Sequence, residues 1–454
     1  MASLLAAVLA AGMLPMSAVT VFAKDPGFTD LQAEIDAAEA GGTVKLDADY
    51  TYKESVTTEP WTVAIDKNII LDLNGHTISG ANTNGRSVIT VKAGAEVELI
   101  DSSASKNGII TCGNSYLNTA ETSGGVYIET GGSFTMTSGT ISGNRTYPAG
   151  GGVTNYGTFT MNGGTISDNA SGYEAGGVYN AGTFTMNGGT ISGNTANNVG
   201  GGVFKNYNGD FTMLGGEITS NKATNSAGGV YGSTTVGGDA NITGNQKGNG
   251  IANNLYCDYY MKITISDAKP LTGNASIGIS SADTPTKDSP VTFSNTVTTD
   301  CSGYFSSDNS AYGVKFNTDH LELVKLAEYK IIAGADGKLT KDAVVDHSIT
   351  GDGSYADFVK LNMDGQVVDA ANYAVKSGST IVTFKKAYLE TLSVGKHEVE
   401  MIWKDGIAKT TLTIAEAPGN PETGDSTNMI LWFSIFAAAA SALAVMMVRG
   451  RRER

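Results

Sequence analysis

The sequence predicts an all-β protein: a parallel β-helix with an N-terminal capping helix, followed by a small β-sandwich and one C-terminal transmembrane helix. Three observations lead to this prediction. Residues 124–245 repeat with a period near 25, residues 327–416 form longer alternating segments, and residues 429–448 are apolar throughout. At 454 residues the chain is long enough for more than one domain.

The composition excludes two broad classes of protein. A formal net charge of −15 and a pI near 4.7 argue against a nucleic-acid binder, which needs a basic surface. Disorder is excluded because 41% of the residues are apolar, so the 58 glycines serve regular turns. The three cysteines are isolated and odd in number, which predicts apolar fillers and no metal site or cofactor: Cys112, Cys257 and Cys301.

The repeat is defined by apolar residues that recur in step. A phenylalanine recurs at spacings of 25, 25 and 27 residues, with a methionine two residues after it each time. An isoleucine and then an asparagine follow, and a valine comes after each pair of glycines. The phenylalanines are Phe134, Phe159, Phe184 and Phe211, and the asparagines are Asn144, Asn169, Asn194, Asn221 and Asn245.

Each repeat contains three short segments of the kinds GGVYN, TFTMNGG and TISGN. Alternation with a period of two predicts strands, with Phe and Met on one face and Thr on the other. Three short strands per repeat, joined by glycine and asparagine, are typical of one coil of a parallel β-helix. We therefore expect the phenylalanines to stack inside the coils and the asparagines to form a hydrogen-bonded ladder at a turn.

The flanking segments extend this prediction to residues 24–326. Residues 28–40 read as an amphipathic helix, with Thr29 and Gln32 at capping-box spacing, which would cover the first coil. Short apolar runs after it predict less regular coils, and we expect the alternating segment 251–326 to supply the final coils.

The motifs LDLNGHTIS at 71–79 and FTMNGGTIS at 159–167 and 184–192 give the repeat region a family resemblance. It resembles right-handed parallel β-helices of the pectate-lyase-like group, which include polymorphic surface proteins of gut bacteria. The resemblance implies a right-handed fold and leaves the function open, because this fold serves many functions.

The second module is predicted from strand-like alternation over 327–416. Apolar residues alternate at 359–363, 381–384 and 399–403, with turns at intervals typical of a small β-sandwich. The segments DGQVVDAANYAVKSGSTIVTF and YLETLSVGKHEVE resemble the X2 type of immunoglobulin-like module of clostridial extracellular enzymes. That resemblance implies a spacer that lifts the β-helix from the cell wall.

The N-terminus predicts secretion. Residues 4–16 are apolar but too short to span a bilayer, and small residues follow at the −3 and −1 positions of a cleavage site. We expect a signal peptide over residues 1–23, cut between Ala23 and Lys24. No basic residue precedes the apolar run, which leaves the true translation start open.

The C-terminus combines three features in order: an NPETG pentapeptide within the linker 417–428, the 20-residue apolar run 429–448 and the basic tail 449–454. This order resembles the sorting signal of Gram-positive surface proteins, in which an LPxTG-type motif is cut between Thr and Gly. The resemblance implies attachment of Thr423 to peptidoglycan by a sortase, with a membrane anchor only before sorting. The motif consists of Asn420, Pro421, Glu422, Thr423 and Gly424, and the asparagine in place of leucine leaves the sortase class open.

No catalytic constellation is predicted. A glycosidase needs two carboxylates close together, but the acids within the repeats occupy different repeat positions: Asp168, Glu174, Asp210 and Glu217. Residues 317–319 match the NTD motif of polygalacturonases, yet the accompanying DD, GHG and RIK motifs do not occur, so a polar turn is the favoured interpretation. The four histidines lack the spacing of metal ligands: His76, His320, His347 and His397.

The candidate ligand face is a column of aromatic residues that each follow an inward valine and therefore point outward: Tyr127, Tyr179, Phe204 and Tyr231, interrupted by Thr154. Such a column could contact sugar rings or a partner protein. Alternatively the rings pack on one another and protect the sheet, which is the interpretation we favour.

These predictions define three functional hypotheses. The leading one is a non-enzymatic, wall-anchored extracellular adhesin that binds a glycan, a host glycoprotein or a neighbouring cell. The second is a polysaccharide lyase or glycosidase with an unfamiliar site. The third is a passive surface stalk.

Overall fold

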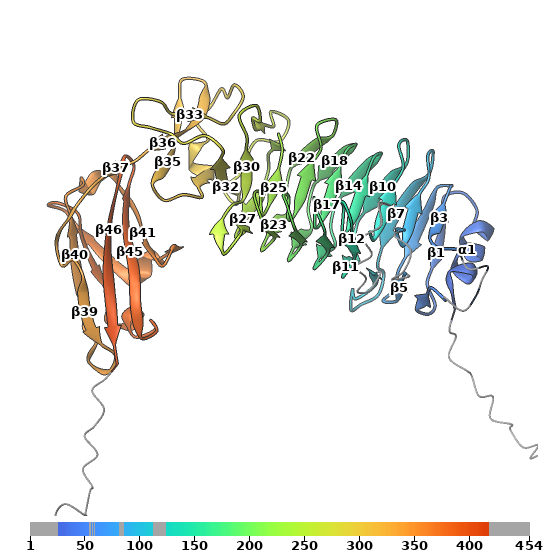
Figure 1. Ribbon diagram of the computed structural model, residues 1–454, viewed down its shortest axis with the longest axis horizontal. Coiled ribbons are helices and arrows are strands. Elements are labelled where there is room, and N and C mark those ends of the chain that lie inside the picture. The colour runs from blue at the N-terminus through green and yellow to red at the C-terminus, as the bar shows by residue number, and fades with distance from the viewer. Residues whose placement is uncertain are drawn as a thin grey trace, which may run out of the picture. The chain divides into compact units, whose positions relative to one another are not determined.

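The computed structural model describes residues 26–53, 56, 58, 60–80, 86–111 and 124–416. It divides into two compact units, with the boundary between Lys325 and Leu326. The first is a parallel β-solenoid of about nine turns, and the second is a pair of small sheets, so the prediction of a mostly β protein built on a β-helix is confirmed (Figure 1).

One face of the solenoid is a nine-stranded parallel sheet that contains the TFTM segments. Its strands, in spatial order, are β1 (Gly42–Lys45), β4 (Ile69–Asp72), β7 (Glu96–Ile100), β10 (Ser133–Met136), β14 (Thr158–Met161), β18 (Thr183–Met186), β22 (Asp210–Met213), β26 (Thr235–Val236) and β31 (Thr264–Ile265).

A second column of parallel strands contains the TIS segments. It runs through β2 (Tyr50–Thr51), β5 (Thr77–Ser79), β8 (Ile109–Thr111), β11 (Thr140–Ser142), β15 (Thr165–Ser167), β19 (Thr190–Ser192), β23 (Glu217–Thr219), β27 (Asn241–Thr243) and β32 (Ser276–Ser281).

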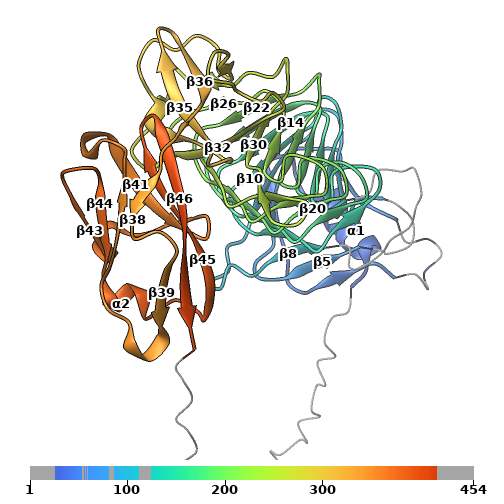
Figure 2. The same ribbon diagram turned by 60° about the vertical axis from the view of Figure 1, so that its left-hand side comes forward.

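A third column contains the VYN segments and carries the candidate face. It runs through β3 (Val63–Ile65), β6 (Ile89–Val91), β9 (Val126–Ile128), β13 (Val153–Asn155), β17 (Val178–Asn180), β21 (Val203–Lys205), β25 (Val230–Tyr231), β30 (Leu255–Cys257), β32 and β34 (Phe305–Ser307). Figure 2 shows these strands stacked coil upon coil.

A fourth, shorter column closes part of the coils: β12 (Arg145–Thr146), β16 (Ala170–Ser171), β20 (Thr195–Ala196), β24 (Lys222–Ala223), β28 (Gln246–Lys247) and β29 (Ile251–Ala252). It is parallel except for the last pair, β28 and β29, which is antiparallel.

The solenoid interior consists of like residues stacked in register. Phe159 pairs with Phe184 and Phe184 with Phe211, and their ring centroids lie 4.7 and 4.8 Å apart. Phe184 has no exposed surface. The predicted phenylalanine ladder is therefore confirmed.

The predicted asparagine ladder is confirmed as well. Asn169 donates its backbone N–H and its side-chain Nδ2 to Asn194 Oδ1, at 3.0 Å each. The same Nδ2 donates to the carbonyl of Ile141 in the preceding coil at 3.0 Å. The pattern recurs from Asn144 through Asn245, and these amides are buried.

The N-terminal helix α1 (Phe28–Ala37) lies at the first coils, as predicted, but it is shorter than residues 28–40 and is capped differently (Figure 1). The capping box predicted from Thr29 and Gln32 is wrong: the N-cap is Gly27, two residues before Thr29, and Asp30 Oδ2 accepts from the Gly27 N–H at 2.7 Å. Gln32 instead exchanges two hydrogen bonds with the backbone of Ala64 in β3, at 2.9 and 2.8 Å. Gln32, which was expected to cap the helix, therefore connects the helix to β3 by hydrogen bonds.

The C-terminal end of the first unit departs from the expected coils. β33 (Val291–Thr292), β35 (Tyr312–Asn317) and β36 (His320–Lys325) form a small antiparallel sheet in the order β33, β36, β35, and the 3₁₀ turn η1 (Ser302–Tyr304) lies between β33 and β35 in the chain. Only two residues, Thr318 and Asp319, join β35 to β36, and so short a connection permits only an antiparallel hairpin. The NTD triplet at 317–319 is this turn.

The second unit contains two sheets. One has the order β37 (Ala327–Glu328), β46 (Gly406–Ala415), β45 (Gly395–Trp403), β41 (Phe358–Met363) and β42 (Gln366–Val367), with β39 (Gly337–Thr340) also on β46. The other has the order β38 (Ile331–Ala333), β40 (His347–Gly351), β44 (Ile381–Phe384) and β43 (Tyr373–Lys376). The connections hold α2 (Lys386–Leu389) and the 3₁₀ turns η2 (Lys341–Ala343), η3 (Tyr355–Asp357) and η4 (Ala370–Asn372).

The core of the second unit contains most of the predicted apolar residues, and Trp403 is its largest buried side chain. Trp403 donates its indole N–H to Thr380 Oγ1 at 2.8 Å. Val359 was expected to alternate inward with Leu361 but is 52% exposed. A register shift between Phe358 and Lys360 explains the difference, because it interrupts the strand alternation at this point.

The phenylalanine ladder generates a stability prediction. Phe184→Ala leaves a cavity between two stacked rings and is expected to lower the free energy of unfolding of the chain 24–423 by about 3–5 kcal/mol. Chemical denaturation followed by circular dichroism measures the change. Thr185→Ala, on the outer side of the same strand, is the matched control; an equal loss in both variants would contradict the ladder's role.

Candidate functional site

The structure brings the four predicted aromatic residues into one column on the outside of the VYN strands. Tyr179, Phe204 and Tyr231 stack directly, with ring centroids 5.6 and 5.2 Å apart. Tyr127 lies at the same register in β9, two coils before Tyr179.

Two further tyrosines complete the column and were missed in the sequence. Tyr256 stacks on Tyr231 with centroids 5.9 Å apart. Tyr156 fills the gap at Thr154, with its ring 5.7 Å from Tyr127 and 6.1 Å from Tyr179. Tyr256 escaped prediction because asparagines replace the glycine pair before its strand, and Tyr156 because it lies in the turn after the strand.

The ring orientations determine what the column offers a ligand. From Tyr179 to Tyr256 the interplanar angles are 15°, 11° and 17°, so neighbouring rings cover one another's faces. Phe204 is only 9% exposed, which corrects its assignment to an open ligand face. The exposed part of the column consists of ring edges and phenol hydroxyls, because in parallel stacking each ring covers the face of its neighbour.

The hydroxyl groups of three column tyrosines remain neutral. Burial raises the pKa of Tyr179, Tyr231 and Tyr256 above the usual value for a phenol. Tyr179 OH accepts a hydrogen bond of 2.5 Å from Asn206 Nδ2 in the turn of the next coil. The column therefore presents hydrogen-bonding groups without charge and is connected to that turn.

Glu174 lies beside this column. It pairs with Ala149 and Val199 of adjacent coils in isolated bridges, and its carboxylate interacts electrostatically with Tyr179 and Tyr231. Burial raises the pKa of this carboxyl. No lysine or arginine among the described residues lies within salt-bridge distance of it. The other acids of the repeats belong to different columns: Asp210 begins β22 and Glu217 begins β23.

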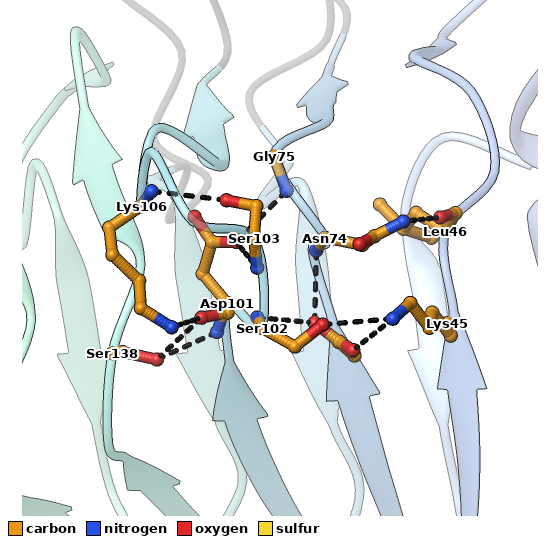
Figure 3. Close-up of polar contacts among 10 residues, drawn as sticks. Lys45, Leu46, Asn74, Gly75, Asp101, Ser102, Ser103, Lys106 and Ser138 are labelled. Atoms are coloured by element: carbon orange, nitrogen blue, oxygen red, sulfur yellow. Dashed lines mark hydrogen bonds and ion pairs between the residues drawn. The ribbon is translucent and has the colours of Figure 1, made fainter.

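A second polar cluster lies at a corner of the first coils and contains the buried carboxylates of Asp72 and Asp101 (Figure 3). Asp101 accepts backbone hydrogen bonds from Gly75, Ser103 and Gly108, at 2.9, 3.0 and 2.7 Å.

Asp72 accepts in the same way from the backbones of Asn74 and Ser102, at 3.0 and 2.8 Å, with Lys45 Nζ 3.7 Å away. Burial opposes ionisation of both carboxyls, but their hydrogen bonds outweigh it and hold the pKa of each below its usual value. Carboxylates occupied by backbone donors stabilise turns and are poorly placed for proton transfer.

The histidines predicted to be structural occupy turns and strand edges. His76 lies 3.3 Å from Asp49, and His320 contacts Asp319 of its own hairpin turn. Cys257 lies in the core, where burial raises the pKa of its thiol to about 12. Within the part of the chain that the structure describes, no group of three or more His, Cys, Asp or Glu side chains is arranged to hold a metal ion.

The sorting motif 420–424, the signal cleavage site at Ala23 and Lys24, the apolar run 429–448 and Cys112 lie outside the described residues. Among the described residues, no helix is both long enough and apolar enough to span a bilayer.

His397 in the second unit generates a pH prediction. Its Nδ1 lies 2.6 Å from Asp364 Oδ2 and its Nε2 lies 2.9 Å from the Ser393 carbonyl. Burial favours the neutral ring, but the Asp364 and Ser393 hydrogen bonds and the Asp364 charge outweigh it and raise the pKa of His397. This interaction therefore stabilises the fold fully below the unfolded-state pKa, about 6.5, and the stabilisation is lost as the pH rises through the folded-state value.

An NMR titration of the chain 24–423 measures this effect. We expect the His397 pKa to lie above the ordinary value for a histidine, and Asp364→Asn to lower it. A His397 pKa unchanged in the Asp364→Asn variant would contradict the assignment.

Comparisons with known proteins do not assign this site to a family. No protein-family model matches the chain, and no curated protein matches it significantly.

Proposed function

We propose that the chain is a secreted, wall-anchored surface protein whose β-solenoid binds a glycan or host-surface ligand without cleaving it. In this proposal the coils are right-handed, the second unit is an immunoglobulin-like spacer of the X2 type, and a sortase joins Thr423 to peptidoglycan. The protein then acts outside the cell, needs no cofactor and does not bind nucleic acid.

The observation that carries the proposal is the aromatic column from Tyr127 to Tyr256. Its rings follow one another along one side of the coils. Burial raises the pKa of Tyr179, Tyr231 and Tyr256, and these three side chains are half-buried. Tyrosine combines apolar contact area with a hydrogen-bonding group at low entropic cost, which suits recognition of surfaces.

A second candidate is a polysaccharide lyase or glycosidase, and one observation favours it. Glu174 is a half-buried carboxyl with a raised pKa beside Tyr179, as a general acid requires. Glycoside hydrolysis requires a second carboxyl nearby, and the buried Asp72 and Asp101 are committed to backbone donors. Binding without cleavage is therefore the better-supported function.

Retention on immobilised ligands tests the binding proposal. The purified chain 24–423 is passed over plant, mucin and bacterial glycans and host glycoproteins, and the eluates are examined for cleavage products. We expect selective retention without products. Cleavage products that disappear in the Glu174→Gln variant would favour the enzyme. No retention on any immobilised ligand would favour the passive-stalk hypothesis.

The column is tested with a variant that keeps its packing. The triple change Tyr179→Phe, Tyr231→Phe and Tyr256→Phe preserves ring stacking and removes three hydroxyls, each worth about 0.5–1.5 kcal/mol in a hydrogen bond. We expect retention to weaken about tenfold or more while the melting temperature changes little. Unchanged binding would exclude the column hydroxyls from the contact.

The anchor is tested in the producing cell. Thr423→Ala is expected to shift the protein from the fraction released by peptidoglycan-digesting enzymes to the membrane fraction. Glu422→Gln, at the variable position of the motif, serves as the control and is expected to remain in the wall fraction. Equal wall attachment of both variants would contradict sorting at Thr423.

A further inference from the structure

The turns that follow the VYN strands differ in length from coil to coil. After β13 and β17 the turn has two residues, 156–157 and 181–182. After β21 it has four, 206–209, and after β30 the chain runs through 258–263 before β31. The two extra residues at 207–208 account for the 27-residue spacing in the otherwise regular repeat.

The longer turns place tyrosines in solvent. Tyr207 is 95% exposed, Tyr259 65% and Tyr260 96%, whereas Tyr156 in its short turn is 36% exposed. In repeat proteins, insertions on one side of the coils commonly form the binding side. An exposed tyrosine does not gain the free energy of apolar burial that stabilises the other aromatic residues of the solenoid. These rings also keep the open faces that the stacked column lacks.

The tyrosine-bearing turns recur at a fixed interval. β13, β17, β21, β25 and β30 are successive neighbours, so the turns after β13, β21 and β30 lie two coils apart. With coils about 4.8 Å apart, the interval is about 9.6 Å, and the three turns span about 19 Å. The intervening turns begin with Ala181 and Gly232, which carry no large side chains of their own, and the Lys205 side chain lies against Gly232.

The tips of the longer turns are held by hydrogen bonds. Gly209 N–H donates to the Asn206 carbonyl at 3.0 Å, and the Asn206 side chain bonds to Tyr179 of the column. At the other turn, Tyr259 N–H donates to Asp258 Oδ1 at 2.7 Å, and Met261 N–H donates to the Asp258 carbonyl at 2.9 Å. The aromatic column thus supports the turn at 206–209, the turn after β30 is held by its own Asp258, and ordered turns reduce the entropic cost of binding.

We propose that Tyr156, Tyr207 and the Tyr259–Tyr260 pair form a binding row for an extended, neutral β-1,4-linked polysaccharide. This proposal rests on the proposed function and names its ligand class. Such a chain presents the same face of every second sugar ring, at an interval close to two coils, so each tyrosine turn meets an equivalent ring. Sugar rings carry apolar C–H faces that pack on aromatic faces, while Asn206, Asn208 and Asp258 supply hydrogen-bonding groups nearby. The net charge of −15 argues against a polyanionic polymer.

Calorimetric titration of the chain 24–423 with cello-oligosaccharides and chito-oligosaccharides of two to eight rings tests the row. Affinity is expected to rise with chain length until all three turns are spanned, at about five or six rings, and then to level off. The triple variant Tyr207→Ala, Tyr259→Ala and Tyr260→Ala is expected to lose at least tenfold in affinity, and the corresponding Phe variant to retain it, because phenylalanine keeps the ring face.

Matched controls come from exposed tyrosines away from the row. Tyr147→Ala and Tyr173→Ala remove rings that are 41% and 48% exposed in the turns after β12 and β16, and are expected to leave affinity unchanged. Because all substituted residues are exposed, the melting temperatures should match that of the parent chain.

The outcomes separate the two proposals. Binding that persists in the alanine triple variant overturns the row and leaves the proposed function standing. Binding only to a protein, or only to polyuronates, overturns the ligand class. Failure of the parent chain to bind any glycan or host glycoprotein overturns both the row and the proposed function.

Discussion

The in-register stacking of parallel coils is the constraint on which the rest of the first unit depends, and buried asparagines enforce it. From Asn169 to Asn245, each Oδ1 accepts from both the backbone and the side chain of the asparagine one coil earlier, and each Nδ2 also donates to an isoleucine carbonyl in that coil. A displaced coil would leave these amide groups unsatisfied in the interior, at about 1–3 kcal/mol for each group. The same register aligns the phenylalanines inside and the tyrosines outside.

The ladder extends beyond the repeat that defines it. Asn245 donates to Asn254, only nine residues later, and Asn254 donates its backbone N–H and Nδ2 to Asp308 at 2.7 and 2.5 Å. Ser280 Oγ also donates to this carboxylate at 2.5 Å. Each asparagine donates toward the next coil as well as to the isoleucine carbonyl of the previous one, and at the last step the donors of Asn254 end on the two carboxyl oxygens of Asp308. The antiparallel hairpin then follows, where no further coil is stacked.

The sequence predicted the parts of the fold that the repeat determines. Phe184, Asn194 and Val178 have the positions that period and alternation assign, because in-register coils translate sequence period directly into spatial neighbours. It failed where one short contact overrides the pattern: the Asp30 cap, the two-residue hairpin turn at Thr318 and the register shift beside Val359. For the candidate site, the column was visible as a repeat, but the ring angles that hide its faces depend on side-chain packing. Tyr207, Tyr259 and Tyr260 were missed because they lie in longer turns, which break the repeat.

The aromatic residues on the outer side of the solenoid have two different roles, and the functional account depends on that difference. Stacked rings in the column stabilise the outer side of the coils, and unstacked rings in the inserted turns remain available to a ligand. The most direct test is a crystal structure of the chain 24–423 with cellohexaose or chitohexaose. The account predicts one extended sugar chain along the turns, with alternate rings packed on Tyr156, Tyr207 and the Tyr259–Tyr260 pair. A sugar chain bound elsewhere on the solenoid, or across the coils beside Glu174, would contradict it.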